Sequence, residues 1–419
     1  MLKFVHAADL HLDSPFVGLA EDEPEIRRLL LEATFKAFDN VIDLCLNENV
    51  DFLLVAGDVY DGKDRSLRAQ LRFREGLQRL SDAGIRAYVV HGNHDPLDSW
   101  TTSLKWPDSV HIFGGSRAES IVHERDGDAK AIIHGISFKK SEVRDNLALR
   151  FTRQDSPLFQ IGLLHCNVGG DTGHENYSPC SRADLESSRL DYWALGHVHK
   201  MQVLKEQGPC IVYSGNTQGR HINEGGPRGC FLVSVDDSGE VQTELVATDA
   251  VRWLSADVPI DGIADVDGII DGLQKCLLGV KSSSDGRPAI CRLTITGRGP
   301  MHSELKRPGQ LDEYMAEARA YGMSLSPFVW PADIRLETGP EIDIDLRMKS
   351  EDIVGDCLRL VREFSTKYER RRELSQCLDE LFLHPRIRIY LEPLGDDVLR
   401  EVLDSAQSLL LDGLLGDDE

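Results

Sequence analysis

The sequence predicts an α/β fold in its first half, because short apolar runs alternate there with longer helical patterns. Five runs rich in β-branched and aromatic residues occur at 4–7, 52–56, 87–90, 161–164 and 192–195. Strands that are buried on both faces of a sheet have this composition. Apolar residues recur at helical spacing across 26–46 and 67–80, between the first three runs, so these segments complete βαβ units.

The later elements follow from changes in this pattern. Strand-like runs at 211–213 and 230–235 flank a glycine-rich stretch, and we expect antiparallel additions to the sheet that close a first domain at 1–250. A smaller α/β domain is expected over 251–348, with strands at 289–296 and 342–346 and a helix at 311–321. Residues 349–419 are expected to form helices: a long charged one over about 351–382, ended by Pro385, and a last one over 396–415.

The last of these helices carries an apolar stripe with two interpretations. One helical face holds Leu399, Val402, Leu403, Ala406, Leu409, Leu410 and Leu414. Such a stripe packs against its own domain or binds a partner protein, and its place beyond a proline and a glycine leaves both alternatives open.

Composition and charge bear on the class of protein. With 41% apolar residues and no stretch near the roughly 20 that a membrane helix needs, we expect no membrane association. No export signal precedes the first strand, and nine cysteines without a CxxC pair suit a reducing compartment, so we expect a cytoplasmic protein. The formal net charge of −23 opposes nucleic-acid binding, although metal ions in a carboxylate-rich cleft supply positive charge.

Polar residues able to ligate metals stand at the carboxyl ends of the five predicted strands, the edge where open α/β sheets bind ligands. They are Asp9, His11, Asp58, Asn93, His94, His165, His197 and His199. Gly57, Gly92 and Gly196 are expected to give the backbone freedom to turn sharply off the strands. Imidazole, carboxylate and amide oxygen without thiolate favour Mn²⁺, Fe²⁺ or Zn²⁺ in a catalytic site. So many ligands predict two divalent ions that share Asp58.

The motifs DLH, GD, GNHD, LLH and GHVH occur in this order, and together they resemble the signature of the calcineurin-like metallophosphoesterase superfamily. The resemblance implies a β-sandwich flanked by helices and a two-metal phosphoesterase. It assigns one metal to Asp9, His11, Asp58 and His199. It assigns the other to Asp58, Asn93, His165 and His197. His94 is implied to be catalytic, in contact with the phosphate and assisting the leaving oxygen.

Longer stretches narrow the resemblance. The SbcD-type DNA repair exonucleases, and especially their YhaO-like branch, are similar to this chain in FVHAADLHLDSPF, HCNVGGDTGHENYSPCS and YSGNTQGR. This implies a small capping domain and C-terminal helices, a homodimer, DNA as substrate, Mn²⁺ as metal and a coiled-coil ABC ATPase of the SbcC type as partner. The chain departs from some nucleases of the wider family at Asp61 in GDVYD, where they have a histidine.

One leading hypothesis and two alternatives follow. The leading hypothesis is a Mn²⁺-dependent DNA exonuclease or endonuclease subunit of a repair complex. The same metal site would serve a phosphatase or a cyclic-nucleotide phosphodiesterase, and the third alternative is a mainly structural subunit that holds the ATPase. His91 is the strongest candidate to support a ligand without ligating.

A basic stretch near the second predicted helix also has two interpretations. It suits a track for DNA phosphates or, more commonly, a solvated helix face. Its residues are Arg65, Arg68, Arg72, Arg74 and Arg79.

Overall fold

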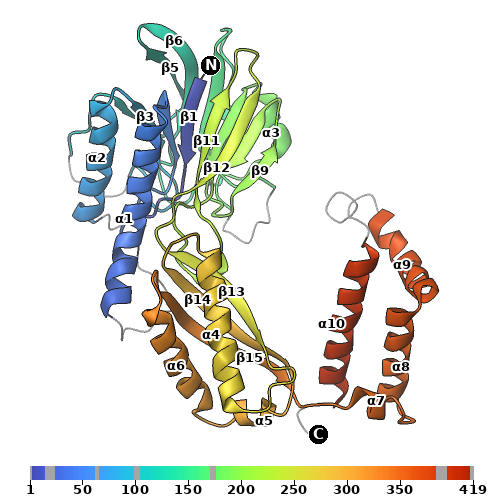
Figure 1. The fold of residues 1–419 in the computed structure, drawn as a ribbon. Helices are drawn as coiled ribbons and strands as arrows, with labels where there is room; N and C mark the ends of the chain where they lie inside the picture. Colours follow the sequence, from blue (N-terminus) through green and yellow to red (C-terminus); the bar gives the residue numbers. More distant parts are fainter. Residues whose placement is uncertain are drawn as a thin grey trace. The chain divides into compact units, whose positions relative to one another are not determined.

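The strand-like runs of the first half form two mixed sheets of six strands each (Figure 1). The computed structural model describes residues 2–14, 24–61, 66–98, 104–169, 176–383 and 394–415. The first sheet, in the order β12-β11-β1-β2-β3-β4, contains β1 (Leu2–Ala7), β2 (Phe52–Ala56), β3 (Arg86–Val90), β4 (Val110–Ile112), β11 (Gly229–Val235) and β12 (Val241–Ala247). The second, in the order β5-β6-β7-β8-β10-β9, contains β5 (Glu119–Arg125), β6 (Asp128–Ile136), β7 (Phe159–His165), β8 (Tyr192–Gly196), β9 (Gln202–Lys205) and β10 (Cys210–Tyr213).

The two sheets pack face to face across an apolar core. Phe4 and Phe52 of the first sheet stack with ring centroids 5.1 Å apart, and Tyr192 of the second sheet meets the Phe4 ring edge-on at 5.3 Å. Ile161 and Leu163 of β7 belong to the same cluster. Strands packed on both faces need apolar residues at consecutive positions, which explains the continuous runs. The predicted α/β sandwich flanked by helices is confirmed.

Helices cover the outer faces of the sandwich. Helix α1 (Pro24–Asn47) and helix α2 (Leu67–Asp82) pack on the first sheet, where Phe38 and Leu77 join Leu53 of β2 in one buried cluster. The short helix α3 (Arg182–Ser187) covers the second sheet through Leu185, which packs in the cluster of Trp193. The first two helices confirm the predicted βαβ units.

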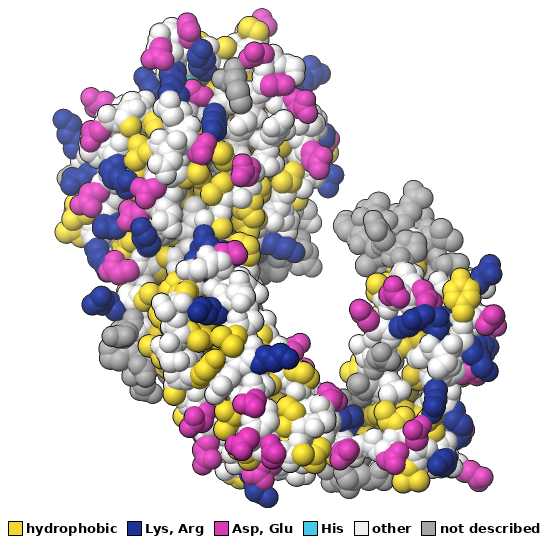
Figure 2. All heavy atoms as spheres, in the orientation of Figure 1, with side chains coloured by type: hydrophobic (Ala, Val, Ile, Leu, Met, Phe, Trp, Pro, Cys, Tyr) yellow, Lys and Arg dark blue, Asp and Glu magenta, His cyan; other side chains and the backbone are white. Residues whose placement is uncertain are grey.

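The arginines of α2 are held by acidic residues of α1. Arg68 pairs with Glu32, and Arg72 and Arg79 pair with two aspartates further along α1. Figure 2 shows acidic and basic side chains interspersed over the visible face of these elements. This pairing favours the solvated helix face over a DNA track, while Arg65 lies outside the described residues.

One predicted strand direction is wrong. The run at 211–213 forms β10, which pairs parallel with β8 and antiparallel with β9. The chain reverses direction within the β9-β10 hairpin, so β10 returns parallel to β8 and lies between β8 and the edge strand. The run at 230–235 forms β11, which pairs antiparallel with β1 as predicted.

Further strands and helices follow the sandwich. The chain divides into one unit of Met1–Ala256, Leu277–Arg292 and Arg319–Asp333, and a second of Asp257–Cys276, Leu293–Ala318 and Ile334–Glu419. A three-stranded sheet contains β13 (Arg252–Pro259), β14 (Ala289–Arg298) and β15 (Val329–Gly339), and the helices among these strands are α4 (Val266–Ser283), α5 (His302–Leu305) and α6 (Gln310–Ser324).

The strand predicted at 342–346 is wrong. The segment contains helix α7 (Ile344–Arg347), which the Asp343 side chain caps by accepting a hydrogen bond from the Leu346 amide at 2.9 Å. Alternating isoleucine, aspartate and leucine residues imitate a strand, but an aspartate that accepts from an amide three residues later starts a helix.

The long helix predicted over 351–382 is two helices, α8 (Ile353–Thr366) and α9 (Tyr368–Leu383). Lys367 between them is extended. The buried Arg371 side chain donates to the Ser365 carbonyl at 2.6 Å and to Asp396 at 2.7 Å. A guanidinium that satisfies the last carbonyls of α8 stabilises the helix end, which the charged sequence pattern does not reveal.

The last helix, α10 (Asp396–Leu415), is found where it was predicted, but its apolar stripe is divided. Leu399, Leu403 and Leu411 are buried, and Leu411 packs with Leu358 of α8. Leu409 is 72% exposed. Within the described part of the chain, no helix is both long and apolar enough to cross a membrane.

Candidate metal centre

Abrupt backbone turns at strand ends direct the predicted ligands inward. Asp9 and His11 follow β1, Asp58 follows β2 and His197 follows β8, with φ angles of 50°, 42°, 49° and 99°. Residues other than glycine rarely adopt this left-handed conformation, and such strain collects at functional sites. All four side chains are nevertheless buried, so the strained turns place polar groups in the interior.

The three glycines beside these turns act in two ways. Gly57 has a φ of +96°, as a sharp turn requires. Gly92 and Gly196 do not share a positive φ, so backbone freedom is the wrong explanation for them. A Cβ on Gly92 would lie 2.3 Å from Asp58 Oδ1, and one on Gly196 would lie 2.0 Å from the Ala56 carbonyl oxygen. These two glycines allow close approach.

One cluster contains Asp58, Asn93 and His165. His165 Nδ1 donates to the Ala56 carbonyl at 2.9 Å, so Nε2 is the ring nitrogen that faces the cluster. That nitrogen lies 3.0 Å from Asn93 Oδ1 and 3.4 Å from Asp58 Oδ2. Burial opposes protonation of His165, but the charges of Asp58 and Asp9 and the hydrogen bonds to Asp58 and Ala56 together outweigh it and raise the imidazole pKa to about 9. The same negative environment that stabilises a proton on His165 suits a bound cation in its place.

A second cluster contains Asp9, His11 and His199. His199 Nδ1 donates to Glu224 Oε1 at 2.6 Å, and its Nε2 lies 3.1 Å from His11 Nε2. Burial, followed by the charge of Arg220, lowers the His11 pKa to about 3, so that ring is neutral. Neutral imidazole is the form that ligates metals, and two facing ring nitrogens fit a bound ion between them.

Asp9 connects the two clusters. Candidate ligand atoms of Asp9, His11 and His199 lie within 4.8 Å of one another, and so do those of Asp9, Asp58 and His165. Burial raises the pKa of Asp9 to about 6, which a bound cation would oppose. Asp9 therefore belongs to both of these groups, and the assignment of Asp58 to both metals stays a prediction.

His197 completes the set of predicted ligands. Its amide donates to both carboxylate oxygens of Asp9 at 3.1 Å, and its ring lies edge-on to His165 with centroids 5.2 Å apart. The structure thus brings together all seven predicted metal ligands from the ends of β1, β2, β3, β7 and β8.

His94, the predicted catalytic residue, lies at the rim of the centre and is held by Asp61. His94 Nδ1 is 3.0 Å from Asp61 Oδ1, and the imidazole is 41% exposed. The hydrogen bond with Asp61 raises the His94 pKa. Ser14 donates to the same carboxylate at 2.6 Å and Arg220 at 3.1 Å. Sequence reasoning noted Asp61 only as a departure and missed this contact.

Two more acidic residues support the centre. Asp95 accepts from the amides of Gly92 and Val59 at 2.7 and 2.9 Å, and His91 lies 2.8 Å from it. Asp95 thereby ties the GNHD turn to the GD turn. Glu224 orients His199. The motif GNHD contains Asp95, so its sequence carried a signal, whereas no pattern in the glycine-rich stretch identifies Glu224.

Comparisons with known proteins agree with this geometry. A family model for calcineurin-like phosphoesterases matches residues 2–201, and one for the middle domain of the metallophosphoesterase YhaO matches residues 253–339. The protein named Uncharacterized metallophosphoesterase YhaO from Bacillus subtilis is 35% identical over 409 residues, which cover 98% of this chain and 97% of that protein.

This chain belongs to the calcineurin-like metallophosphoesterases. More distant relatives of this metallophosphoesterase include the DNA double-strand break repair protein Mre11 of Thermoplasma acidophilum, 24% identical over 74% of this chain and 80% of that protein. One component of the nuclease SbcCD of Bacillus subtilis is 25% identical over 64% of this chain and 75% of that protein.

The donor set of the metallophosphoesterase fits divalent ions, which proteins of this family use. Such ions, when bound, supply Lewis acidity toward phosphoryl oxygens. Asp61 holds His94 through Nδ1, so the proton transfer predicted for His94 would use Nε2. Arg220 pairs with the same carboxylate at 3.1 Å, which places a guanidinium close to His94.

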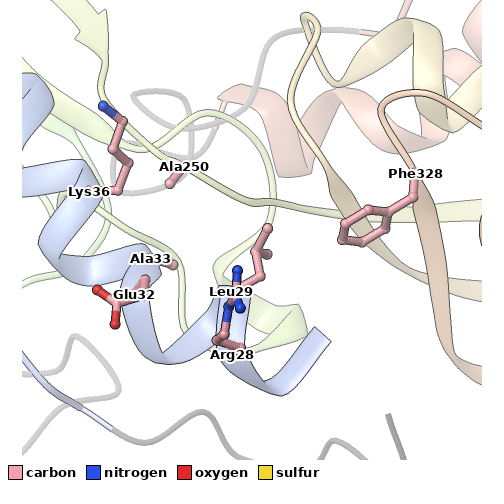
Figure 3. Close-up of a pocket in the computed structure, with 7 residues that line it drawn as sticks. All are labelled: Arg28, Leu29, Glu32, Ala33, Lys36, Ala250 and Phe328. Atoms are coloured by element: carbon pink, nitrogen blue, oxygen red, sulfur yellow. The ribbon is translucent and has the colours of Figure 1, made fainter. Parts of the chain in front are cut away.

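A separate cavity of about 670 Å³ lies beside α1 (Figure 3). Its lining combines Leu29 and Phe328 with the charged residues Arg28, Glu32 and Lys36. None of the predicted metal ligands lines it, so the metal centre is distinct from this cavity.

Proposed function

We propose that this metallophosphoesterase is a Mn²⁺-dependent DNA nuclease that hydrolyses phosphodiesters with two metal ions. Asp9, His11, Asp58, Asn93, His165, His197 and His199 are the proposed ligands. His94 is the proposed proton donor to the leaving oxygen. The observation that carries the proposal is the convergence of these groups at one edge of the sandwich, and the names of the Mre11 and SbcCD relatives support DNA as the substrate.

A phosphatase or cyclic-nucleotide phosphodiesterase is the second candidate, and the charge of the chain favours it. The net charge of −23 and the paired arginines of α2 leave little free positive charge for a long polyanion. A small substrate with a single phosphate needs less free positive charge for binding than a long polyanion does.

Substrate preference under one Mn²⁺ concentration separates these candidates. Linear duplex DNA, single-stranded DNA, a cyclic nucleotide and a phosphopeptide would be compared, with His94→Ala to identify contaminating activity. We expect DNA to be hydrolysed and the variant to lose turnover while it keeps its metal. A clear preference for the cyclic nucleotide or the phosphopeptide would refute the nuclease proposal.

The proposed assembly is a homodimer with an SbcC-type ATPase docked on the helices of 349–419, after a capping domain at 251–348. Val398 and Val402 of α10 are 45% and 46% exposed, and Leu409 is 72% exposed. Exposed apolar residues at helical spacing suit a groove in a partner. Val402→Asp should abolish co-purification with the ATPase, whereas Glu401→Ala, on the same exposed surface, should retain it.

A further inference from the structure

A groove of about 790 Å³ adjoins the metal centre at His199, and its lining is rich in positive charge. The basic residues that line it are Lys200, Arg220, His221 and Arg228. Glu224 also lines it and adds one negative charge, and both of its carboxylate oxygens accept hydrogen bonds. One oxygen accepts from His199 at 2.6 Å, and the other accepts from the Arg220 amide at 2.7 Å.

Arg228 is a buried cation whose hydrogen bonds go to neutral oxygens. It is 8% exposed, and it donates to the carbonyls of His199, Glu224 and Gly225 at 2.6, 3.1 and 3.3 Å and to the Asn216 amide oxygen at 3.2 Å. Buried charges are normally paired with an opposite charge. Hydrogen bonds to carbonyl oxygens fix this guanidinium at the groove wall, and the carboxylates of Glu224 and Asp249 are the negative charges that act on it.

Arg220 and Lys200 bring donors to the same groove. Arg220 bonds Asp61 and Ser14 through Nη1, while its buried Nε has no hydrogen-bond partner among the described residues. Lys200 is exposed and forms no ion pair with any residue that the structure describes. Because Asp61 holds both Arg220 and His94, an anion bound by these donors would lie next to the reaction centre.

We infer that this groove is a second phosphate subsite, which binds the phosphate next to the scissile one in a polyphosphodiester chain. The inference rests on the proposed function, since only a substrate with consecutive phosphates fills both the metal centre and the groove. An isolated monoester or diester would leave the groove's donors unused. The groove therefore makes the site selective for oligonucleotides over substrates with one phosphate.

Binding of small nucleotides tests the inference without turnover. The full chain loaded with Mn²⁺ would be titrated calorimetrically with thymidine 3′,5′-bisphosphate and thymidine 5′-monophosphate. We expect the bisphosphate to bind about tenfold more tightly, as one additional charge-assisted contact would provide. Lys200→Ala should remove most of this preference and leave the monophosphate affinity within about twofold. The matched control Lys130→Ala, on the β5-β6 hairpin, should keep both affinities.

Each alternative result has a defined meaning. Equal affinities in the unmodified chain would overturn the subsite, and so would a Lys200→Ala variant that weakens both ligands equally, because that residue would then act through the metal centre. A bisphosphate preference in a protein that cleaves no DNA would refute the proposed function and leave the subsite standing. DNA cleavage without the preference would refute the subsite alone.

Discussion

The metal centre and the C-terminal helices differ in how completely their residues are buried. Asp9, Asp58 and His165 are at most 1% exposed, and each is held by a strand end. Among the described residues, the apolar cluster that joins α8 and α10 is small and contains Val354, Leu358 and Leu411. A site that must hold ions in one geometry needs rigid support, whereas a region with few buried contacts opens more easily. The contrast agrees with the proposal that chemistry takes place in the sandwich and association through the helices.

The largest expected effect is a loss of metal and of turnover at the metal centre. Asp58→Ala removes a carboxylate that faces both His165 Nε2 and the amide of His94, so the site should lose metal and turnover should fall by about 10⁴-fold. Metal content by mass spectrometry and hydrolysis of bis(p-nitrophenyl) phosphate check this. If Asp58→Ala kept both ions and its activity, the conclusion that the buried centre holds the metals and carries the chemistry would be wrong.

The stability of the C-terminal helices should depend on whether the substituted face of α10 is buried or exposed. Two neighbouring residues of α10 provide a matched pair for this test. Leu403→Asp places a charge in the buried face and should destabilise the helices by about 3 kcal/mol. Val402 is 46% exposed, so Val402→Asp should change their stability by less than about 0.5 kcal/mol. Hydrogen exchange of α8 and α10 measures both. Equal losses of protection would mean that the two faces are not distinct.

The sequence predicted the buried strands and the residues that follow them because both depend on local patterns, whereas the sandwich was implied by the resemblance. Continuous apolar runs mark buried strands, and short motifs follow them at fixed positions, as for Asp58 after β2 and His165 at the end of β7. The sequence did not predict features that depend on contacts between residues far apart in the chain. The break at Lys367 depends on Arg371 and Asp396, and these interactions leave no periodic signal.

The contact between His94 and Asp61 lies in the exposed part of the centre. The His94 ring is expected to depend on Asp61 to hold its position there. Asp61→Asn keeps the shape but weakens the hydrogen bond that raises the His94 pKa, so turnover should fall by about 10²-fold for DNA. The loss should be smaller for p-nitrophenyl esters, whose leaving group needs no proton, and the metal content should not change. Equal losses for both substrates would show that Asp61 acts on metal binding instead.

The smallest expected effect is a difference between the two regions in how their stability depends on pH. His123 of β5 is buried against Phe52, with ring centroids 4.7 Å apart, and burial lowers its pKa from 6.5 to about 4. The unfolded chain takes up this proton near pH 6.5 and the folded chain does not until about pH 4. The unfolded state therefore binds more protons in this interval, and stability is lost as the pH falls through it.

The loss due to His123 should reach about 1.4 kcal/mol at pH 5.5, and a similar loss is expected from His6, whose pKa burial lowers to about 3. The C-terminal helices should not share it, because Arg371 keeps the pKa of Asp396 below its usual range. All five tryptophans belong to the first unit, so fluorescence-detected urea unfolding at pH 7.5 and 5.5 reports that unit, and hydrogen exchange reports the helices. His123→Gln should reduce the pH-dependent loss by about 1.4 kcal/mol. If the variant unfolds with the unchanged dependence, or if the helices lose protection in parallel, the acid sensitivity does not arise from histidines buried in the sandwich.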